Sequence, residues 1–145
     1  MGFRSSQPNR VLTFQVCNEL FKKARYCKYL SKKKTWIYNG SCEVEKVKGV
    51  RLENNTYLIK HADCYSVRLY DTDIIDIYPN KWVFSNGGYR TNTTKDRIQR
   101  YSVLSISVSQ YVWYYRIGDW TQDADTKVFE NGLTLTKEDI LEHLI

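Results

Sequence analysis

Turn dipeptides divide most of this chain into short runs in which apolar and polar residues alternate. Asn39-Gly40 and Asn131-Gly132 are hairpin signals, and Asn54-Asn55 and Pro79-Asn80 mark two further turns. Because short loops of this kind join antiparallel neighbours, they restrict the chain to hairpins. We therefore expect an α+β fold built on a mostly antiparallel sheet of about six to eight strands.

Three helices are expected beside this sheet. Apolar residues recur at three- and four-residue spacing from Val16 to Cys27, which predicts a long basic N-terminal helix over residues 9–34. A short helix should follow the turn G-G-Y-R-T-N-T-T-K, with Thr93 or Thr94 as its N-cap. Thr136 is the expected cap of a short C-terminal helix.

The length of 145 residues fits one domain with its own core. We predict a single domain over residues 1–145. Its parts are a flexible arm (1–8), the basic helix (9–34), a β-rich core (35–135) and the C-terminal helix (136–145).

Several protein classes do not fit this composition. No apolar run reaches the roughly 18 residues that span a bilayer, and the N-terminus carries no apolar signal core. The cysteines form no C-x-x-C pair and the two histidines are far apart, so we expect neither a metal nor a cofactor. Reduced thiols in a cytoplasm are the simplest interpretation.

Positive charge is concentrated at the N-terminal end of the chain. Residues 1–34 carry nine Lys or Arg against one Glu (9 − 1 = +8), and residues 102–145 carry three basic against seven acidic side chains (3 − 7 = −4). This asymmetry indicates an anionic partner for the N-terminal part. The alternative is that the acidic C-terminal segment folds back on the basic helix.

The basic helix provides one candidate site for an anion. Lys22, Arg25, Tyr26, Tyr29 and Lys33 fall within one arc if the helix extends that far, and Lys32 and Lys34 flank it. Basic side chains interleaved with tyrosines can contact phosphates and stack on bases. The alternative is a solvated face whose long side chains keep the helix soluble.

The stretch NGGYRTNTTKDRIQRY, residues 86–101, provides a second candidate site. A helix N-terminus next to hydroxyl and basic side chains can hold an anion, although the Walker A spacing is absent. The candidates here are Arg90, Thr91, Thr93, Thr94, Lys95 and Arg97, with Tyr89 as an aromatic contact. A capped strand-to-helix turn with a basic exterior is the structural alternative.

The same stretch resembles a family of small proteins found mainly in bacteriophages. That family has the pattern N-x-G-G-[WY]-x-T-x-T-T-K-x-R-[IM], and the resemblance covers about residues 54–135. Its elements fall on Asn55, Leu69 to Ile74, Pro79-Asn80, Asn86 to Ile98, Trp113-Tyr114 and Phe129 to Gly132. Asn80-Lys81 stands where Asp-Gly is usual, and residues 1–50 lie outside the pattern. The resemblance implies a viral origin and no particular activity.

Three further clusters have a structural interpretation beside a functional one, and the structural one is commoner. They are an aromatic row (Tyr111, Trp113, Tyr115), a carboxylate group (Asp71, Asp73, Asp76) and a candidate thiol nucleophile (His61, Asp63, Cys64). We assign no catalytic residue and no metal ligand.

Three functions remain open on these observations. The first is a phage accessory protein that binds nucleic acid or another polyanion. The second is a phage protein-binding module, either a virion component or an inhibitor of a host or defence enzyme. The third is an enzyme or small-nucleotide binder that uses the threonine-rich turn. The expected location is the cytoplasm of the infected host cell, or the virion.

Overall fold

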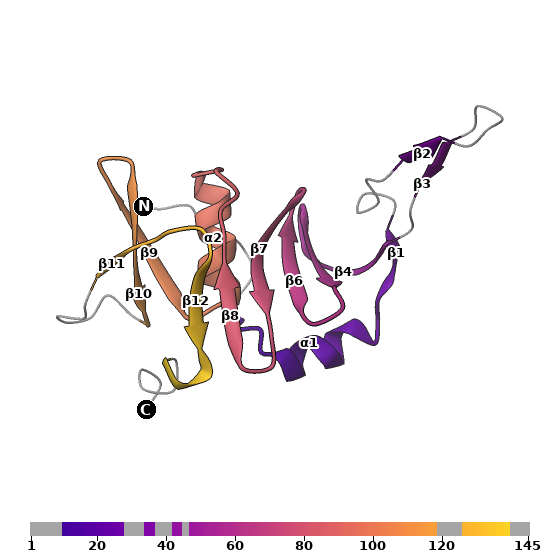
Figure 1. Ribbon diagram of the computed structural model, residues 1–145, viewed down its shortest axis with the longest axis horizontal. Helices are drawn as coiled ribbons and strands as arrows, with labels where there is room; N and C mark the ends of the chain where they lie inside the picture. The colour runs from indigo at the N-terminus through magenta and orange to yellow at the C-terminus, as the bar shows by residue number, and fades with distance from the viewer. Residues whose placement is uncertain (1–9, 28–33, 37–41, 45–46, 119–125, 140–145) are drawn as a thin grey trace.

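The computed structural model describes residues 10–27, 34–36, 42–44, 47–118 and 126–139 (Figure 1). Its helices are α1 (Phe14–Phe21) and α2 (Asn92–Tyr101). Its strands are β1 (Arg25–Cys27), β2 (Lys34–Trp36), β3 (Cys42–Val44), β4 (Val47–Glu53), β5 (Thr56–Lys60), β6 (Tyr65–Leu69), β7 (Thr72–Ile77), β8 (Lys81–Phe84), β9 (Leu104–Ser109), β10 (Val112–Ile117), β11 (Lys127–Val128) and β12 (Leu133–Thr136). The fold is mostly antiparallel β-sheet with short helices, as the turn signals indicate.

The main sheet has seven strands in the order β1-β4-β5-β6-β7-β8-β12, and each described pair is antiparallel. One row of side chains shares a face across six of these strands: Val50, Leu58, Val67, Ile75, Phe84 and Leu133. The middle four are fully buried. Alternation of apolar residues therefore selects the face of the sheet that the core covers.

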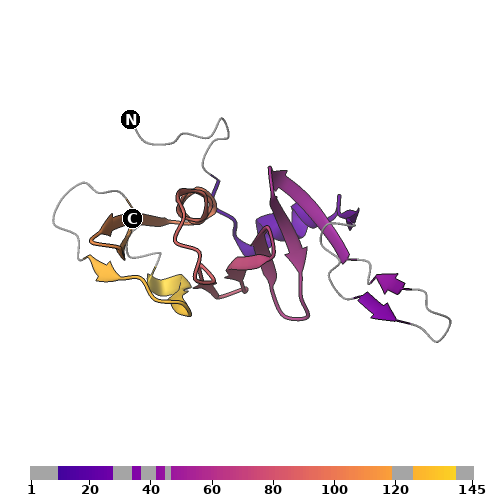
Figure 2. The ribbon, with the colours of Figure 1, turned by 90° about the horizontal axis from the view of Figure 1, so that it is seen from above.

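Two of the predicted turns join neighbouring strands within the described residues. Asn55 adopts a positive φ of 59° between β4 and β5, and Pro79-Asn80 lies between the paired strands β7 and β8. β2 and β3 also pair, with Trp36 opposite Cys42, and the turn predicted between them at Asn39-Gly40 lies outside the described residues. This hairpin projects away from the main sheet (Figures 1 and 2).

The hairpin predicted around Asn131-Gly132 is wrong. The strands on either side of that turn belong to two sheets, because β11 pairs with β10 and β12 pairs with β8. The Gly132 N–H donates to the Phe84 carbonyl at 2.8 Å, so the turn is held by a strand distant in sequence. A turn signal specifies a change of direction and does not specify the partner strand.

Helix α2 lies between the main sheet and the second sheet, whose order is β11-β10-β9 (Figures 1 and 2). It contacts β9 on one side and β7 on the other. One continuous core holds Ile98 of α2, Phe84 of the main sheet, and Trp113 and Phe129 of the second sheet region. The two sheets are therefore packed through α2.

The long N-terminal helix predicted over residues 9–34 is wrong in the described residues. Helix α1 begins after its N-cap Thr13 and ends at Phe21, with Lys22 as its C-cap. Residues 25–27 form β1 instead and pair with β4 at the edge of the main sheet. Helical spacing continues beyond Phe21, but backbone pairing with an existing strand outweighs that weak local preference.

The other predicted helices start close to the expected positions. Thr91 caps α2, rather than Thr93 or Thr94. Thr136 caps the C-terminal helical turn: its N–H donates to Asp139 Oδ2 at 2.9 Å, and its Oγ1 accepts from the Asp139 N–H at 3.3 Å. The predicted residues 140–145 of that helix lie outside the described residues. None of the helices in the described segments is long and apolar enough to cross a membrane.

Candidate functional site

The loop between β8 and α2 explains the glycine pair of the signature stretch. Gly87 and Gly88 have φ of 62° and 86°, a region that glycine occupies without strain. The Gly88 N–H donates to Asn86 Oδ1 at 2.8 Å, and the Asn86 N–H donates to Asn131 Oδ1 at 2.9 Å. A β-carbon on Gly87 would lie 2.5 Å from Thr72 Cγ2, so the loop packs tightly against the start of β7.

The threonine hydroxyls that follow are used within the helix cap. Thr91 Oγ1 accepts from the Thr94 N–H at 3.1 Å, and the two hydroxyl oxygens are hydrogen-bonded at 2.9 Å. Thr94 is 3% exposed. Because these hydroxyls already have partners and Thr94 is buried, the cap accounts for the crowding of threonine without an anion. Thr93 and Lys95 are half-buried on the same helix.

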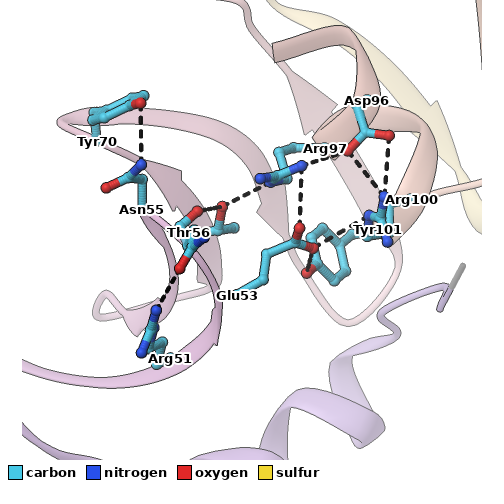
Figure 3. Close-up of polar contacts among 10 residues, drawn as sticks. Arg51, Glu53, Asn55, Thr56, Tyr70, Asp96, Arg97, Arg100 and Tyr101 are labelled. Atoms are coloured by element: carbon cyan, nitrogen blue, oxygen red, sulfur yellow. Dashed lines mark hydrogen bonds and ion pairs between the residues drawn. The ribbon is translucent and has the colours of Figure 1, made fainter. Parts of the chain in front are cut away.

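Arg97 and Arg100 of α2 point into the protein, where they meet Glu53 of β4 (Figure 3). Glu53 Oε1 lies 3.1 Å from Arg97 Nη1, and Glu53 Oε2 lies 3.2 Å from Arg100 Nε. Asp96 pairs with both guanidinium groups from the same helix. With Tyr101, which also bonds to Glu53, these residues form what we call the buried ion cluster.

The buried ion cluster contains equal numbers of opposite charges. Glu53 and Asp96 offset Arg97 and Arg100, and the Arg97 Nε–H donates to Thr56 Oγ1 at 3.0 Å. Burial, together with the hydrogen bond to Glu53, raises the pKa of Tyr101 well above its usual value, so its hydroxyl stays protonated. At 6% exposure, Arg97 serves packing inside the molecule, which argues against its predicted contact with an external phosphate.

A cavity of about 270 Å³ opens beside the cap of α2. Leu69 and Ile74 are its buried aliphatic residues, and Tyr70 and Tyr89 stand more than half exposed. Asp71, Thr72, Asn86, Thr91 and Thr94 complete its lining. The signature stretch therefore forms one wall of a mainly apolar pocket, which we call the tyrosine pocket.

The basic candidates of the N-terminal part lie at the opposite edge of the main sheet from β12. Arg25 and Tyr26 are exposed on β1, and Lys48 of β4 places its Nζ 5.0 Å from the centre of the Tyr26 ring. Lys22 is exposed and pairs with Glu19 at 3.0 Å. With Lys23, which is also exposed, we call Lys22, Arg25, Tyr26 and Lys48 the basic edge.

The remaining predicted anion contacts are less informative. Lys34 lies on β2, whereas Tyr29, Lys32 and Lys33 fall outside the described residues. Arg90 is exposed and donates from Nη1 to the Tyr111 carbonyl at 2.9 Å. The structure therefore brings Lys22, Arg25 and Tyr26 together and separates them from the residues around α2.

Residues of the candidate thiol site do not assemble into a nucleophilic centre. His61 Nε2 lies 2.9 Å from Asp73 Oδ2, and Arg68 Nε donates to the other oxygen of Asp73 at 2.7 Å. Cys64 is buried, which raises the pKa of its thiol and keeps it neutral. Burial also raises the pKa of Asp76, whose Oδ1 accepts from Ser66 Oγ at 2.6 Å.

The aromatic row and the carboxylate group also have structural roles. Trp113 and Tyr115 are buried at 3% and 8% exposure, so the predicted platform with the exposed Tyr111 does not form. In the described segments, no group of three His, Cys, Asp or Glu side chains is arranged to hold a metal ion.

Sequence reasoning missed Glu53 and Tyr70. Glu53 reads as an ordinary polar position in an alternating strand, because only the tertiary fold brings two arginines of α2 to it. Tyr70 reads as the last residue of a strand, yet it has φ of 54° and lies in the β6–β7 turn. The adjacent Asp71 was a weak signal for that turn.

These features define a small protein of mostly antiparallel β-sheet with short helices, a tyrosine pocket and an exposed basic edge. The chain matches the Kyanoviridae Gp96 protein family over residues 22–136, and it belongs to that family of phage proteins. The match begins well before residue 54, so it includes β1 and β4, which the resemblance left outside. Comparison with curated proteins found no match, and comparison with solved structures found none.

Proposed function

We propose that this small phage protein binds nucleic acid through the basic edge. The observation that carries the proposal is the exposed Tyr26 ring on an edge strand, with Lys48 over it. Exposed aromatic rings next to cations are the elements with which proteins bind single-stranded nucleic acid, because bases stack on the ring while phosphates meet the cations.

The charge around β1 supports this proposal. Residues 19–27 and 47–51 carry five Lys or Arg and one acidic side chain, Glu19. Side chains alternate along β1, so Arg25 and Tyr26 point to opposite faces and positive charge lies on both sides of the edge. In the described part of the chain no strand pairs with the outer side of β1, which gives a nucleic-acid strand access to both faces.

The contacts around α2 also favour the basic edge, rather than the turn before α2, as the nucleic-acid site. Arg97 is paired inside the buried ion cluster, and the Thr91 and Thr94 hydroxyls are bonded to each other. We place the action of the protein in the cytoplasm of the infected host cell or in the virion, which the phage family supports.

Charge reversal at the basic edge tests the proposal. In Arg25→Glu/Lys48→Glu, we expect weaker binding of a fluorescein-labelled single-stranded 20-mer, measured by fluorescence anisotropy between ~50 and ~200 mM salt. If each side chain meets one phosphate, the slope of log K against log salt should become shallower by about 1.4, because each phosphate on a single strand contributes about 0.7.

The matched control is Lys127→Glu/Lys137→Glu, which changes net charge equally at exposed positions away from β1. It should bind more tightly than the first variant. Tyr26→Ala should lower affinity by about 1–3 kcal/mol without changing the salt slope, because it removes stacking and no charge. Equal weakening by the two charge pairs, or no binding at ~50 mM salt, would contradict the proposal.

A further inference from the structure

Four turns converge at the end of the molecule where α2 begins. Asn55 of the β4–β5 turn donates from Nδ2 to the Tyr70 hydroxyl at 3.1 Å (Figure 3). Gly87 packs on Thr72, and Arg90 bonds to the Tyr111 carbonyl in the β9–β10 turn. The β6–β7 turn, the β8–α2 loop and the β9–β10 turn accordingly lie along the upper side of Figure 1.

The tyrosine pocket lies within this group of turns. Its walls are mainly apolar, and several of the polar groups that line it are hydrogen-bonded within the protein. Asn86 Oδ1 accepts from the Gly88 N–H, and Thr91 and Thr94 bond to each other. A ligand therefore meets carbon atoms on the pocket walls, which offer little for a polar group to bind.

We infer that the tyrosine pocket receives a bulky apolar side chain from an extended segment of a partner protein. The cavity of about 270 Å³ is large enough for one such side chain and lies near the lower end of the ~300–1,000 Å³ range of ligand sites. Tyr70 and Tyr89, 62% and 58% exposed, flank the cavity. Rigid tyrosines around a desolvated pocket are the usual anchor of a protein interface.

The lining also distinguishes this occupant from a nucleotide. A phosphate needs cationic or N–H donors, and Asp71 is the charged residue among those that line the pocket. A base needs unpaired donors and acceptors, whereas Asn86 Oδ1 and the Thr91 and Thr94 hydroxyls already have partners. The inference concerns a different site and a different class of partner from the basic edge.

A peptide selection tests this inference with the full-length protein. A library of random twelve-residue peptides is selected against the immobilised chain, and the most enriched peptide is then synthesised. We expect enriched peptides to share a bulky apolar residue. We also expect the synthetic peptide to shift the amide NMR signals of Gly88 and Thr91, which border the pocket.

Two tyrosine variants separate the pocket from the rest of the turn surface. Tyr89→Ala should weaken the synthetic peptide at least about tenfold, which is the usual cost of truncating an interface anchor. Tyr111→Asn removes a tyrosine that is 88% exposed and does not line the pocket, and asparagine accepts its φ of 66°. It should leave the affinity unchanged.

Thermal melts of both variants within about 2 °C of the unmodified chain establish that neither change acts through unfolding. The inference is overturned if no peptide is enriched, if enriched peptides share no apolar residue, or if Tyr89→Ala binds as tightly as the unmodified chain. It is also overturned if a mixture of nucleoside monophosphates raises the melting temperature and Tyr89→Ala abolishes that rise.

Discussion

Glu53 shows how one side chain fixes the position of a helix on a sheet. Its two carboxylate oxygens contact Arg97 and Arg100, and the Tyr101 hydroxyl donates to it. These three residues lie within little more than one turn at the end of α2, whereas Glu53 ends β4. Because the carboxylate accepts bonds from all three, a rotation or shift of α2 along the sheet would leave buried charge unpaired.

We predict that Glu53→Gln lowers the free energy of unfolding by about 3–5 kcal/mol. Asp96 would then be the one carboxylate of the cluster left to pair with the two buried arginines. Urea denaturation followed by circular dichroism measures the change. Glu130→Gln, at an exposed position, is the matched control. A loss below about 1 kcal/mol, typical of surface pairs, would mean that the cluster does not stabilise the fold.

Gly87 and Gly88 offer a matched pair for a second residue-level prediction. Gly88→Ala should cost about 1–2 kcal/mol from its positive φ alone, because no atom lies within 4 Å of the added methyl. Gly87→Ala should cost more, since its methyl overlaps Thr72. Thr72→Ser removes the Cγ2 methyl group. Added to Gly87→Ala, it should therefore restore part of the lowered urea concentration at the unfolding midpoint. Equal costs for the two alanines would contradict the tight contact.

Among the elements, α2 is held at its N-terminus by a cap, along its length by the buried ion cluster and on one side by β9. The side chain of Gln99 accepts from the Ile106 N–H at 2.8 Å. This hydrogen bond occupies the Ile106 N–H on the outer edge of β9. Without it, that backbone donor would be open to another strand. The helix therefore also protects the edge of the second sheet.

The position of the cap gives an element-level prediction. Thr91→Ala should lower the free energy of unfolding by about 1 kcal/mol, because the Thr94 N–H loses its acceptor. Thr93→Ala, two residues into the helix, should change it by less than about 0.5 kcal/mol. Thermal melts of the two variants show which threonine contributes more to stability. The reverse order would assign the cap to Thr93, as local sequence alone suggests.

For the whole molecule, the arrangement of strands separates two surfaces. The basic edge lies on β1, the first strand of the main sheet, whereas the tyrosine pocket is built by β6, β7 and the loop before α2. A single apolar core runs from α1 through the main sheet to Trp113 and Phe129. The two proposed binding surfaces therefore lie at separate places on one chain.

Much of the β architecture is predictable from particular residues. Asn55 and Pro79-Asn80 mark turns that are used, and the alternation of Val67 and Leu69 identifies the buried side of β6. The candidate site is less predictable. Arg97 and Thr94 have the local pattern of an anion site, yet they are buried because partners distant in sequence cover them. Local pattern reports residue type and spacing and carries no information about such partners.

The turn residues are enough to predict short antiparallel strands, because glycine, proline and asparagine act through local backbone geometry. The sequence also sets the excess of positive charge near the N-terminus. Three outcomes appear only in the folded chain: α1 ends at Phe21, β11 and β12 join different sheets, and Glu53 pairs with the arginines of α2. These outcomes depend on contacts between distant segments, whose energies exceed the local preferences that a sequence displays.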